Sequence, residues 1–572
     1  MKGKLNQTIS LKALLFAILM FTVIQSSFAK YNFAAKNSTQ KIEIHKKWLL
    51  LPVKNGGEKK DVVIYYNGQE VRKINIELAN EKPDWYAYVD VSEWKNKTLK
   101  ISILQTEEST NAFSLIKQSN KDLEKSSLYK EADRGQLHFS PKRGWTNDPN
   151  GLVYYKGEYH LFFQHNPYGV LWGNMHWGHA VSKDLVHWKE IGEALYPDQF
   201  GTIFSGSAVV DKNNTSGFGT TNNPPMVMCY TYDKVWEQGL AYSIDGRNFS
   251  KLPNPVIKKV TDGNRDPKII WYAPEKKWVL VLYVEEANKQ HTVHFYTSKN
   301  LKDWKLASIT KGGIGNDHYL FECPDFYQLP VKGKPNEKKW VLTAANAEYA
   351  IGTFDGTTFN PEYSRLKSMQ GRGYYAAQSF TNDPKGRKIE IGWWQTNTNN
   401  GTNYFNQSMS IPMKLELVET KDGLRISRTP VEELKKLRSK HYAFNNLKIN
   451  SKTITPITLK ADNSLEISFH LQIETAKNIT ITVKGLPIIY NTENQTLTVN
   501  GVAAKLPLND NSLDLLIYMD RIGLEIFANQ GTFYMPVSKN LDKDAKSLDF
   551  KGDGGEAKIS TLDIYELNSI WK

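Results

Sequence analysis

A turn pattern that recurs through the middle of the chain constrains the fold most strongly. The segment SKDLVHW at 182–188 resembles SKNLKDW at 298–304, with SIDGRNF at 243–249 between them and FDGTTF at 354–359 further on. In each segment a strand-like run ends in a small or polar residue, meets a turn and then reaches an aromatic residue. The first three begin 61 and 55 residues apart. This period predicts the blades of a β-propeller, and the alternative is four unrelated polar hairpins.

The regions on either side also indicate β-structure. Residues 41–103 hold alternating apolar runs, with Asn67-Gly68 between two of them as a hairpin signal. A Lys- and Ser-rich stretch at 118–134 reads as a linker, and TPVE at 429–432 predicts a helix that Thr429 caps. Strands resume at about 440. We therefore predict a β-sandwich at 30–125, a propeller at 135–428, a linker helix at 429–440 and a second sandwich at 441–572.

The N-terminus predicts an exported protein. Residues 1–29 combine three lysines, a short apolar run and a small-residue cleavage pattern, as in a signal peptide. The apolar run is too short for a typical membrane span. Its removal takes away three Lys and no acids, which lowers the formal charge from +13 to +10. The remaining lysines are scattered, so we favour a soluble surface over an anionic partner and expect no nucleic acid.

The chain has two cysteines, Cys229 and Cys323. This number argues against a disulfide framework in an exported protein. A single bridge and two separate thiols are both compatible with the sequence. We favour buried thiols, because both residues lie in apolar, strand-like segments.

Three acidic residues lie beside proline in unusual local settings. Asp148 stands in WTNDPNG at 145–151, Asp266 in RDP at 265–267, and Glu322 in FECPD at 321–325. Proline biases the residue before it toward an extended backbone, so Asp148 is presented from a stiff turn. Hydrolysis of a glycosidic bond needs two facing carboxyl groups, one as nucleophile and one as proton donor. The three acids could supply that pair, although an ordinary Asx-Pro turn would also explain Asp148.

The neighbours of the other two acids predict different charge states. The guanidinium of Arg265 should lower the pKa of Asp266 and keep this carboxylate ionised. Phe321 and Cys323 should favour the neutral form of Glu322, as a general acid requires. The alternatives are a structural ion pair for Asp266 and an exposed strand end for Glu322.

In this order, the three motifs resemble the signature motifs of glycoside hydrolase family 32, which includes invertases, levanases and inulinases. The resemblance continues in HLFFQHNP at 160–167, WGNMHWGH at 172–179, FSGS at 204–207, YAAQ at 375–378, and Asp520-Arg521 through Phe527. It covers about 440 residues, from near 135 to the end of the chain.

The resemblance implies an all-β fold, with a five-bladed propeller followed by a C-terminal β-sandwich. It also implies that Asp148 is the nucleophile, Glu322 the acid/base and Asp266 the transition-state stabiliser of a retaining double displacement. The residues implied to line the pocket for a terminal fructose are Asn147, Gln164, Trp172, Phe204, Ser205, Arg265 and Trp393.

No cofactor or metal is implied. His176 and His179 are three residues apart and would point to opposite faces of a strand, which disfavours a zinc site.

Gly373 departs from the family pattern, because relatives often carry Asp there, and this leaves the local pocket shape open. The N-terminal sandwich resembles an accessory module, whose Trp85 and Trp94 we expect in its core rather than on a glycan-binding surface.

The sequence thus predicts an exported β-fructosidase that acts on levan or inulin, with sucrose as a further substrate, and releases fructose from chain ends. The alternatives are a fructosyltransferase or an endo-levanase of the same family and, in another class, a fructan-binding protein without activity. We expect a fructan polysaccharide or oligosaccharide as the partner and no stable membrane insertion. The sequence indicates no oligomeric state.

Overall fold

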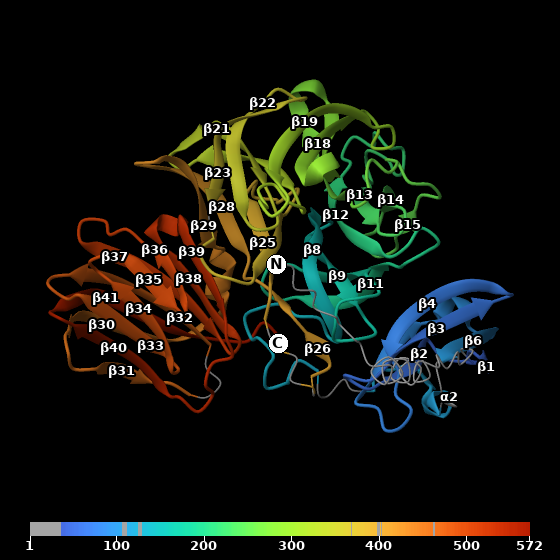
Figure 1. The fold of residues 1–572 in the computed structure, drawn as a ribbon, viewed down its shortest axis with the longest axis horizontal. Helices are drawn as coiled ribbons and strands as arrows, with labels where there is room; N and C mark the ends of the chain where they lie inside the picture. Colours follow the sequence, from blue (N-terminus) through green and yellow to red (C-terminus); the bar gives the residue numbers. More distant parts are fainter. Residues whose placement is uncertain are drawn as a thin grey trace, which may run out of the picture.

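The computed structural model describes residues 36–105, 111–123, 128–367, 369–396, 398, 401, 403–460 and 464–571. The predicted signal peptide at 1–29 lies outside these residues. The described chain is mostly β-structure, arranged as a propeller with a β-module on one side and a β-sandwich on the other (Figure 1). No helix in the described part is long and apolar enough to cross a membrane.

The propeller has five blades of antiparallel strands. The first four are β8 (Gly144–Tyr155) to β11 (Lys189–Leu195), β12 (Ile203–Val210) to β15 (Ser250–Lys251), β16 (Arg265–Tyr272) to β19 (Lys305–Ile314), and β20 (Asp325–Val331) to β23 (Phe359–Lys367). The middle strands of these blades are β9 (Glu158–Asn166), β10 (His176–Ser182), β13 (Met226–Tyr232), β14 (Glu237–Ser243), β17 (Lys277–Glu286), β18 (Gln290–Ser298), β21 (Lys334–Thr343) and β22 (Glu348–Phe354).

The fifth blade contains β24 (Tyr374–Ser379), β25 (Lys388–Trp394), β28 (Met413–Thr420) and β29 (Gly423–Pro430), with the short β27 (Ser408–Met409) beside β25. Another short strand, β26 (Phe405–Asn406), pairs with β8 of the first blade. The first strand of each blade contacts the first strand of the next, and β24 contacts β8, so the ring is closed.

The recurring turn predicted from the sequence occupies the same place in each of the first four blades, between the third and fourth strands. In the first three blades the serine that ends the third strand hydrogen-bonds the side chain two residues on, with O···O distances of 3.2, 3.0 and 3.2 Å. That side chain, or Asp355 in the fourth blade, accepts hydrogen bonds from the backbone N–H groups of the turn. The propeller prediction is therefore confirmed, and the repeat is a turn that each blade needs.

The N-terminal module, as defined here, comprises β1 to β7. One sheet has the order β1 (Lys36–Glu43), β6 (Thr98–Gln105), β3 (Lys59–Tyr66) and β4 (Gln69–Glu77), and the other has β5 (Trp85–Asp90), β2 (Trp48–Val53) and β7 (Lys117–Ser119). Short helices lie at η1 (Ser92–Trp94) and α2 (Ala112–Leu115). Trp85 and Trp94 are 1% and 7% exposed, which confirms them as core residues.

The C-terminal β-sandwich packs two six-stranded sheets. One contains β30 (Arg438–Ile449), β41 (Ala557–Leu567), β32 (Ser464–Ile473), β37 (Ser512–Asp520), β38 (Gly523–Ala528) and β39 (Phe533–Ser538). The other contains β31 (Ile454–Thr458), β40 (Ser547–Asp553), β33 (Asn478–Val483), β34 (Leu486–Asn491), β35 (Thr496–Val499) and β36 (Val502–Lys505).

Two sequence predictions about the connections are wrong in part: a short helical connector is present, but its start, its cap and the bounds of the earlier linker differ from those predicted. Thr429 and Pro430 end strand β29, opposite Lys414 and Met413, and the connector is a 3-10 helix, η4 (Glu432–Leu437), without a side-chain cap. Pairing across the sheet prevails over the local capping signal there. The predicted linker at 118–134 is also too long at both ends, because Gln118 lies in β7 and Arg134 is buried.

Candidate active site

One pocket gathers all ten residues that the sequence predicts to be catalytic or substrate-binding. It has a volume of about 230 Å³ and lies where the first strands of the blades begin. Its lining consists of Asn147, Asp148, Gln164, Trp172, Phe204, Ser205, Arg265, Asp266, Glu322, Tyr375 and Trp393. Ten of these eleven were named from the sequence. Tyr375 was missed as a lining residue, although the YAAQ segment that contains it was recognised.

A shared backbone device presents these side chains. In β8, β12, β16 and β24, two residues on the first strand oppose one on its neighbour, which leaves one extra residue in each. These bulges fall at 146–149, 203–206, 265–268 and 375–378. A bulge bends the strand and redirects side chains, and bulges are common beside active sites. Asp148, Ser205 and Asp266 therefore leave the regular ladder just where their strands enter the pocket.

The backbone of two of the acids is also strained. Asp266, Glu322 and Cys323 have φ values of 67°, 40° and 43°. Such left-handed conformations of residues other than glycine cost on the order of 1–3 kcal/mol each and cluster at functional sites. The fold maintains this strain through the surrounding contacts, for example the hydrogen bond from Ala345 N to Glu322 O at 3.0 Å.

Asp148 is held by two donors. Ser205 Oγ donates to Asp148 Oδ2 at 2.6 Å, and Asn147 Nδ2 donates to Oδ1 at 3.1 Å. Burial and the nearby charge of Glu322 raise the pKa of Asp148, while these two hydrogen bonds oppose the rise. Trp145 Nε1 in turn donates to Asn147 Oδ1 at 3.0 Å, which fixes the orientation of the amide. The two hydrogen bonds therefore hold the Asp148 carboxylate in place and offset part of the rise in its pKa.

Glu322 lies in a polar setting, which differs from the apolar one expected from its sequence neighbours. Arg265 Nε and Nη2 donate to Glu322 Oε2 at 3.0 and 2.7 Å, and the Tyr375 hydroxyl donates to Oε1. Phe321 instead packs against the Arg265 guanidinium at 5.4 Å. The local sequence misled because the side chain of Glu322 turns away from its apolar neighbours and into the pocket.

The expected low pKa of Asp266 is also wrong. Burial raises the pKa of Asp266, and the charges of Glu322 and Asp148 raise it further. The positive charge of Arg265 opposes this rise. However, its Nε is 3.8 Å from Asp266 Oδ2, and the pair of N–H groups on Nε and Nη2, its fork, donates to Glu322. The Cys323 N–H donates to Asp266 Oδ2 at 2.9 Å. Burial and the neighbouring carboxylates therefore favour the neutral form of Asp266.

The two cysteines are free and buried, which confirms that prediction. The Cys323 sulfur lies 3.5 Å from Asp148 Oδ2 and 3.4 Å from Asp266 Oδ2, a position that the sequence did not predict. Burial and the adjacent carboxylates raise the pKa of its thiol, so Cys323 stays protonated. A thiol S–H is a weak donor and can direct its proton to either aspartate.

Aromatic side chains form the rim of the pocket. Trp172 and Phe204 meet edge to face at 6.1 Å, and Trp393 makes similar contacts with Trp145 at 6.0 Å and Tyr375 at 6.2 Å. Trp393 Nε1 donates to Gln407 at 3.1 Å. Flat apolar faces with polar edges suit the faces of sugar rings. Gly373, with φ 80°, lies beside this wall, where its carbonyl accepts from Gln395 N at 2.7 Å.

The histidines weighed as zinc ligands have other partners. His179 Nε2 lies 2.9 Å from His160 Nδ1, and His176 bonds the backbone carbonyl of Asn174. Burial lowers the pKa of both His176 and His179. Within the described ranges there is no group of three or more His, Cys, Asp or Glu side chains that could hold a metal ion.

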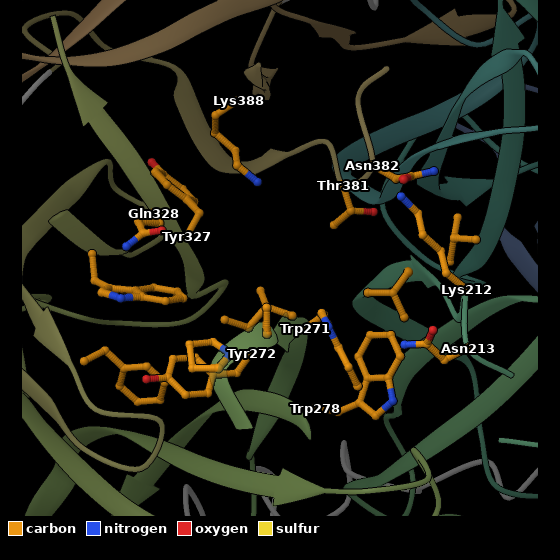
Figure 2. A pocket seen from close by; sticks show the side chains of 17 residues that line it. Lys212, Asn213, Trp271, Tyr272, Trp278, Tyr327, Gln328, Thr381, Asn382 and Lys388 are labelled. Atoms are coloured by element: carbon orange, nitrogen blue, oxygen red, sulfur yellow. The ribbon is translucent and has the colours of Figure 1, made fainter. Parts of the chain in front are cut away.

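A second, larger pocket of about 660 Å³ shares no lining residue with the first. Figure 2 shows its side chains around an open centre, among them Trp271, Trp278, Tyr327 and Lys388. They come from the ends of β16 and β12 and from neighbouring strands, whereas the acids lie where such strands begin. The two pockets therefore lie at opposite ends of the propeller.

Comparison with known families agrees with this geometry. The N-terminal domain of glycosyl hydrolases family 32 matches residues 138–430, and the C-terminal domain of the same family matches residues 433–566. Residues 34–138 match a domain of unknown function, DUF4980. The N-terminal family match alone spans half of the chain.

Individual relatives point the same way. A levanase of Bacillus subtilis (strain 168) is 38% identical over 523 residues, which are 83% of this chain and 76% of the relative. An extracellular exo-inulinase of Aspergillus awamori is 32% identical over 520 residues, 77% of this chain and 96% of the relative. A crystal structure of exo-inulinase from Aspergillus awamori superimposes with a TM-score of 0.69 at 30% identity, covering 77% of this chain and all of that chain. The chain therefore belongs to glycosyl hydrolase family 32 and is a retaining glycoside hydrolase of the β-fructofuranosidase type.

Proposed function

We propose that this enzyme is an exported fructan hydrolase that removes fructose from the ends of β-fructan chains. The observation that carries the proposal is the convergence of Asp148, Asp266 and Glu322 on one pocket from three different blades. In this proposal Asp148 is the nucleophile, Glu322 the acid/base and Asp266 the stabiliser of the transition state.

In the first step, an oxygen of Asp148 attacks the anomeric carbon of the terminal fructosyl unit. The bond from that carbon to the bridging oxygen breaks, and Glu322 transfers its proton to the leaving oxygen. Ser205 and Asn147 hold the nucleophile for this attack through their hydrogen bonds to both of its oxygens. The result is a fructosyl ester on Asp148 and a chain shorter by one unit.

In the second step, water attacks the same carbon from the side that the leaving group vacated. Glu322 accepts a proton from the water, and the ester bond to Asp148 breaks to release fructose with retained configuration. Positive charge develops on the ring in both steps. Asp266 is fixed in place by Cys323 N–H and can interact with that charge without reorganisation.

The dimensions of the pocket support exo action. Its volume of about 230 Å³ is below the roughly 300–1,000 Å³ typical of sites that enclose drug-sized ligands. One sugar unit fits such a space better than a bound stretch of polymer does. The names of the relatives support fructan as the substrate, and the higher identity to a levanase than to an exo-inulinase favours levan over inulin.

Export is part of the same proposal. Residues 1–29 have the pattern of a signal peptide, and exo-inulinases similar to this chain are named as extracellular. A polymer such as levan has to be degraded outside the cytoplasm, so the location and the proposed substrate are consistent.

Product analysis tests the proposal. The purified enzyme is incubated separately with levan, inulin and sucrose, and samples taken over time are resolved by chromatography. Fructose as the sole early product from levan is the expected result. A ladder of oligosaccharides would indicate endo action, products longer than the substrate would indicate transfer, and no product from any substrate would indicate a binding protein.

A further inference from the structure

The loop that carries Trp172 is attached to the N-terminal module rather than to the propeller alone. This Trp172 loop, residues 167–175, connects β9 and β10 of the first blade. Trp172 is 52% exposed and lies at the rim of the active-site pocket. A half-exposed side chain on a loop needs support from its flanking residues if it is to contact a sugar reproducibly.

The first support is a hydrophobic anchor. Tyr168 and Val170, each 2% exposed, belong to the hydrophobic core of the N-terminal module, together with Trp85 and Trp94. Both residues come from the propeller chain, on the N-terminal side of Trp172. The core of the module is therefore completed by the loop, and the loop is fixed by that core.

The second support is a polar clamp on the other side of Trp172. Asn174 Nδ2 donates to Asn75 O at 2.8 Å, and Asn75 N donates to Asn174 Oδ1 at 2.8 Å. Asn75 lies in β4, the edge strand of its sheet, whose outer backbone groups have no neighbouring strand. The Asn174 amide takes the place of a strand residue and pairs with both backbone groups. Asn174 itself has φ 44°, in the left-handed region that asparagine tolerates.

Two cation–π contacts lie in the interface around these supports. In one the arginine comes from the module, and in the other it comes from the propeller. Arg72 of the module packs against Tyr196 of the propeller at 4.9 Å, and Arg143 of the propeller packs against Tyr88 of the module at 4.4 Å. Arg143 also forms an ion pair with Asp122. These contacts tie the module to the propeller beside the clamp and the anchor.

We propose that the N-terminal module is a structural part of the active site, which sets the position of Trp172 through Asn174, Tyr168 and Val170. The proposal rests on the proposed function in one respect, namely that Trp172 contacts bound sugar. The Aspergillus awamori exo-inulinase structure is matched over its full length by 77% of this chain. The extra module thus adds a support for the pocket rim to the one that Asn166 of β9 gives, which contacts Asn174 Nδ2 at 3.0 Å and Leu171 O at 2.7 Å.

Enzyme kinetics with a matched control tests this role. Asn174→Gly removes the clamp and tolerates the left-handed backbone, whereas Asn75→Ala keeps the backbone groups that Asn174 uses. On fructan we expect kcat/KM to fall about tenfold in Asn174→Gly, because misplacement of a positioning group by about 1 Å can cost up to 100-fold. Most of this loss should appear in KM. We expect Asn75→Ala to stay within about twofold of the unmodified enzyme.

A double-mutant cycle shows whether Asn174 acts through Trp172. Trp172→Ala alone should lower kcat/KM, and adding Asn174→Gly to it should change kcat/KM by less than about twofold. Independent, multiplying losses would overturn the proposal, as would an Asn174→Gly enzyme with unchanged kinetics. The midpoint of thermal unfolding of each variant identifies a general loss of folding.

Hydrogen exchange provides a readout that does not depend on activity. In Asn174→Gly the backbone amides of 168–176 should exchange faster than in the unmodified enzyme, and in Asn75→Ala they should not. Unchanged exchange in Asn174→Gly would refute the support by the module even if fructose release is normal. An enzyme without activity but with the expected exchange pattern would refute the proposed function and leave the role of the module supported.

Discussion

Arg265 directs its guanidinium to Glu322, 57 residues away, and not to the adjacent Asp266. Its Nε and Nη2 lie 3.0 and 2.7 Å from one oxygen of Glu322, whereas Asp266 Oδ2 is 3.8 Å from Nε. Burial would lower the pKa of Arg265, but the charges of Asp266 and Glu322 raise it, so the guanidinium remains charged. Arg265 therefore links the second and third acids of the site.

Replacing this fork with a point charge should impair the enzyme. Lysine keeps the positive charge of Arg265 but cannot make two parallel hydrogen bonds from a planar group. The loss of one charge-assisted hydrogen bond, roughly 1.5–3 kcal/mol, predicts a fall in kcat/KM of about 10- to 150-fold for Arg265→Lys. Steady-state kinetics on the fructan that the enzyme prefers measure this. A rate within twofold of the unmodified enzyme would show that the fork has no role in turnover.

Asp148→Ala and Glu322→Gln should each lose most of their turnover while still binding fructan. The first removes the group that forms the proposed covalent intermediate, and the second removes a proton transfer that contributes about 10²–10⁴-fold. Initial rates of fructose release give kcat, and binding is measured by affinity electrophoresis in levan. Near-normal rates in either variant would contradict the role assigned to that residue.

Tyr375→Phe tests the contact that was not foreseen. The substitution removes one hydroxyl, which donates to Glu322 Oε1, and leaves the ring in contact with Trp393. We expect kcat to fall about 10- to 150-fold, as for a hydrogen bond to a charged group worth roughly 1.5–3 kcal/mol. The KM should change less, because the hydroxyl positions Glu322. A fall confined to KM would instead indicate a direct contact with the sugar.

The repeated turns show why much of the fold could be predicted from the sequence. Ser182, Ser243 and Ser298 each end the third strand of a blade and bond the polar side chain two residues later. This interaction is local, so it leaves a readable pattern in the chain. The motifs around the three acids were recognisable for the same reason, because WTNDPNG, RDP and FECPD are each short runs of neighbouring residues.

The errors concern interactions between segments that are distant in sequence. The direction of the Arg265 side chain depends on Glu322, and the pKa of Asp266 depends on burial by the blades around it. Thr429 carries a local capping signal, but β29 pairs with β28 there. Such outcomes are decided by tertiary contacts, which neighbouring residues do not encode.

Asp266→Asn should separate catalysis from stability. Because the proposed contact of Asp266 strengthens in the transition state, we expect kcat to fall more than KM changes. The raised pKa of Asp266 means that ionisation is less favourable in the folded protein than in the unfolded chain. The free energy of unfolding therefore contains a contribution from protonated Asp266. This contribution is complete below the ordinary aspartate pKa, about 3.9, and is lost as the pH rises through the raised pKa of Asp266.

The amide introduced by Asp266→Asn carries no charge at any of these pH values. The Asp266→Asn enzyme should therefore unfold at a higher temperature than the unmodified enzyme at pH 8, and the difference should shrink toward pH 4. Calorimetry across this pH range measures both trends. A variant that is less stable at pH 8 would mean that the carboxylate stabilises the fold, contrary to the direction of its pKa shift.

His138 should make the joint between propeller and sandwich sensitive to alkali. Its Nδ1 lies 2.7 Å from Asp520 Oδ2 and its Nε2 lies 3.2 Å from Glu525 Oε2, with all three side chains buried. Burial alone would lower the pKa of His138, but the hydrogen bonds to the two carboxylates raise it to about 9. A raised histidine pKa stabilises the fold fully below the unfolded value, about 6.5, and this stabilisation is lost as the pH rises through about 9.

His138→Gln leaves two buried carboxylates without their cation, which predicts a loss of about 3–5 kcal/mol at pH 6. Since the unmodified enzyme loses the same stabilisation in alkali, the difference between the two proteins should narrow from pH 6 to pH 10. Urea unfolding of both proteins at pH 6, 8 and 10 measures this difference in the free energy of unfolding, taken from the first unfolding transition. The control is His187→Gln, whose partly exposed side-chain contact with Asp184 at 3.1 Å should be worth less than about 1 kcal/mol. A difference that stays constant with pH would show that His138 acts by packing and not by charge.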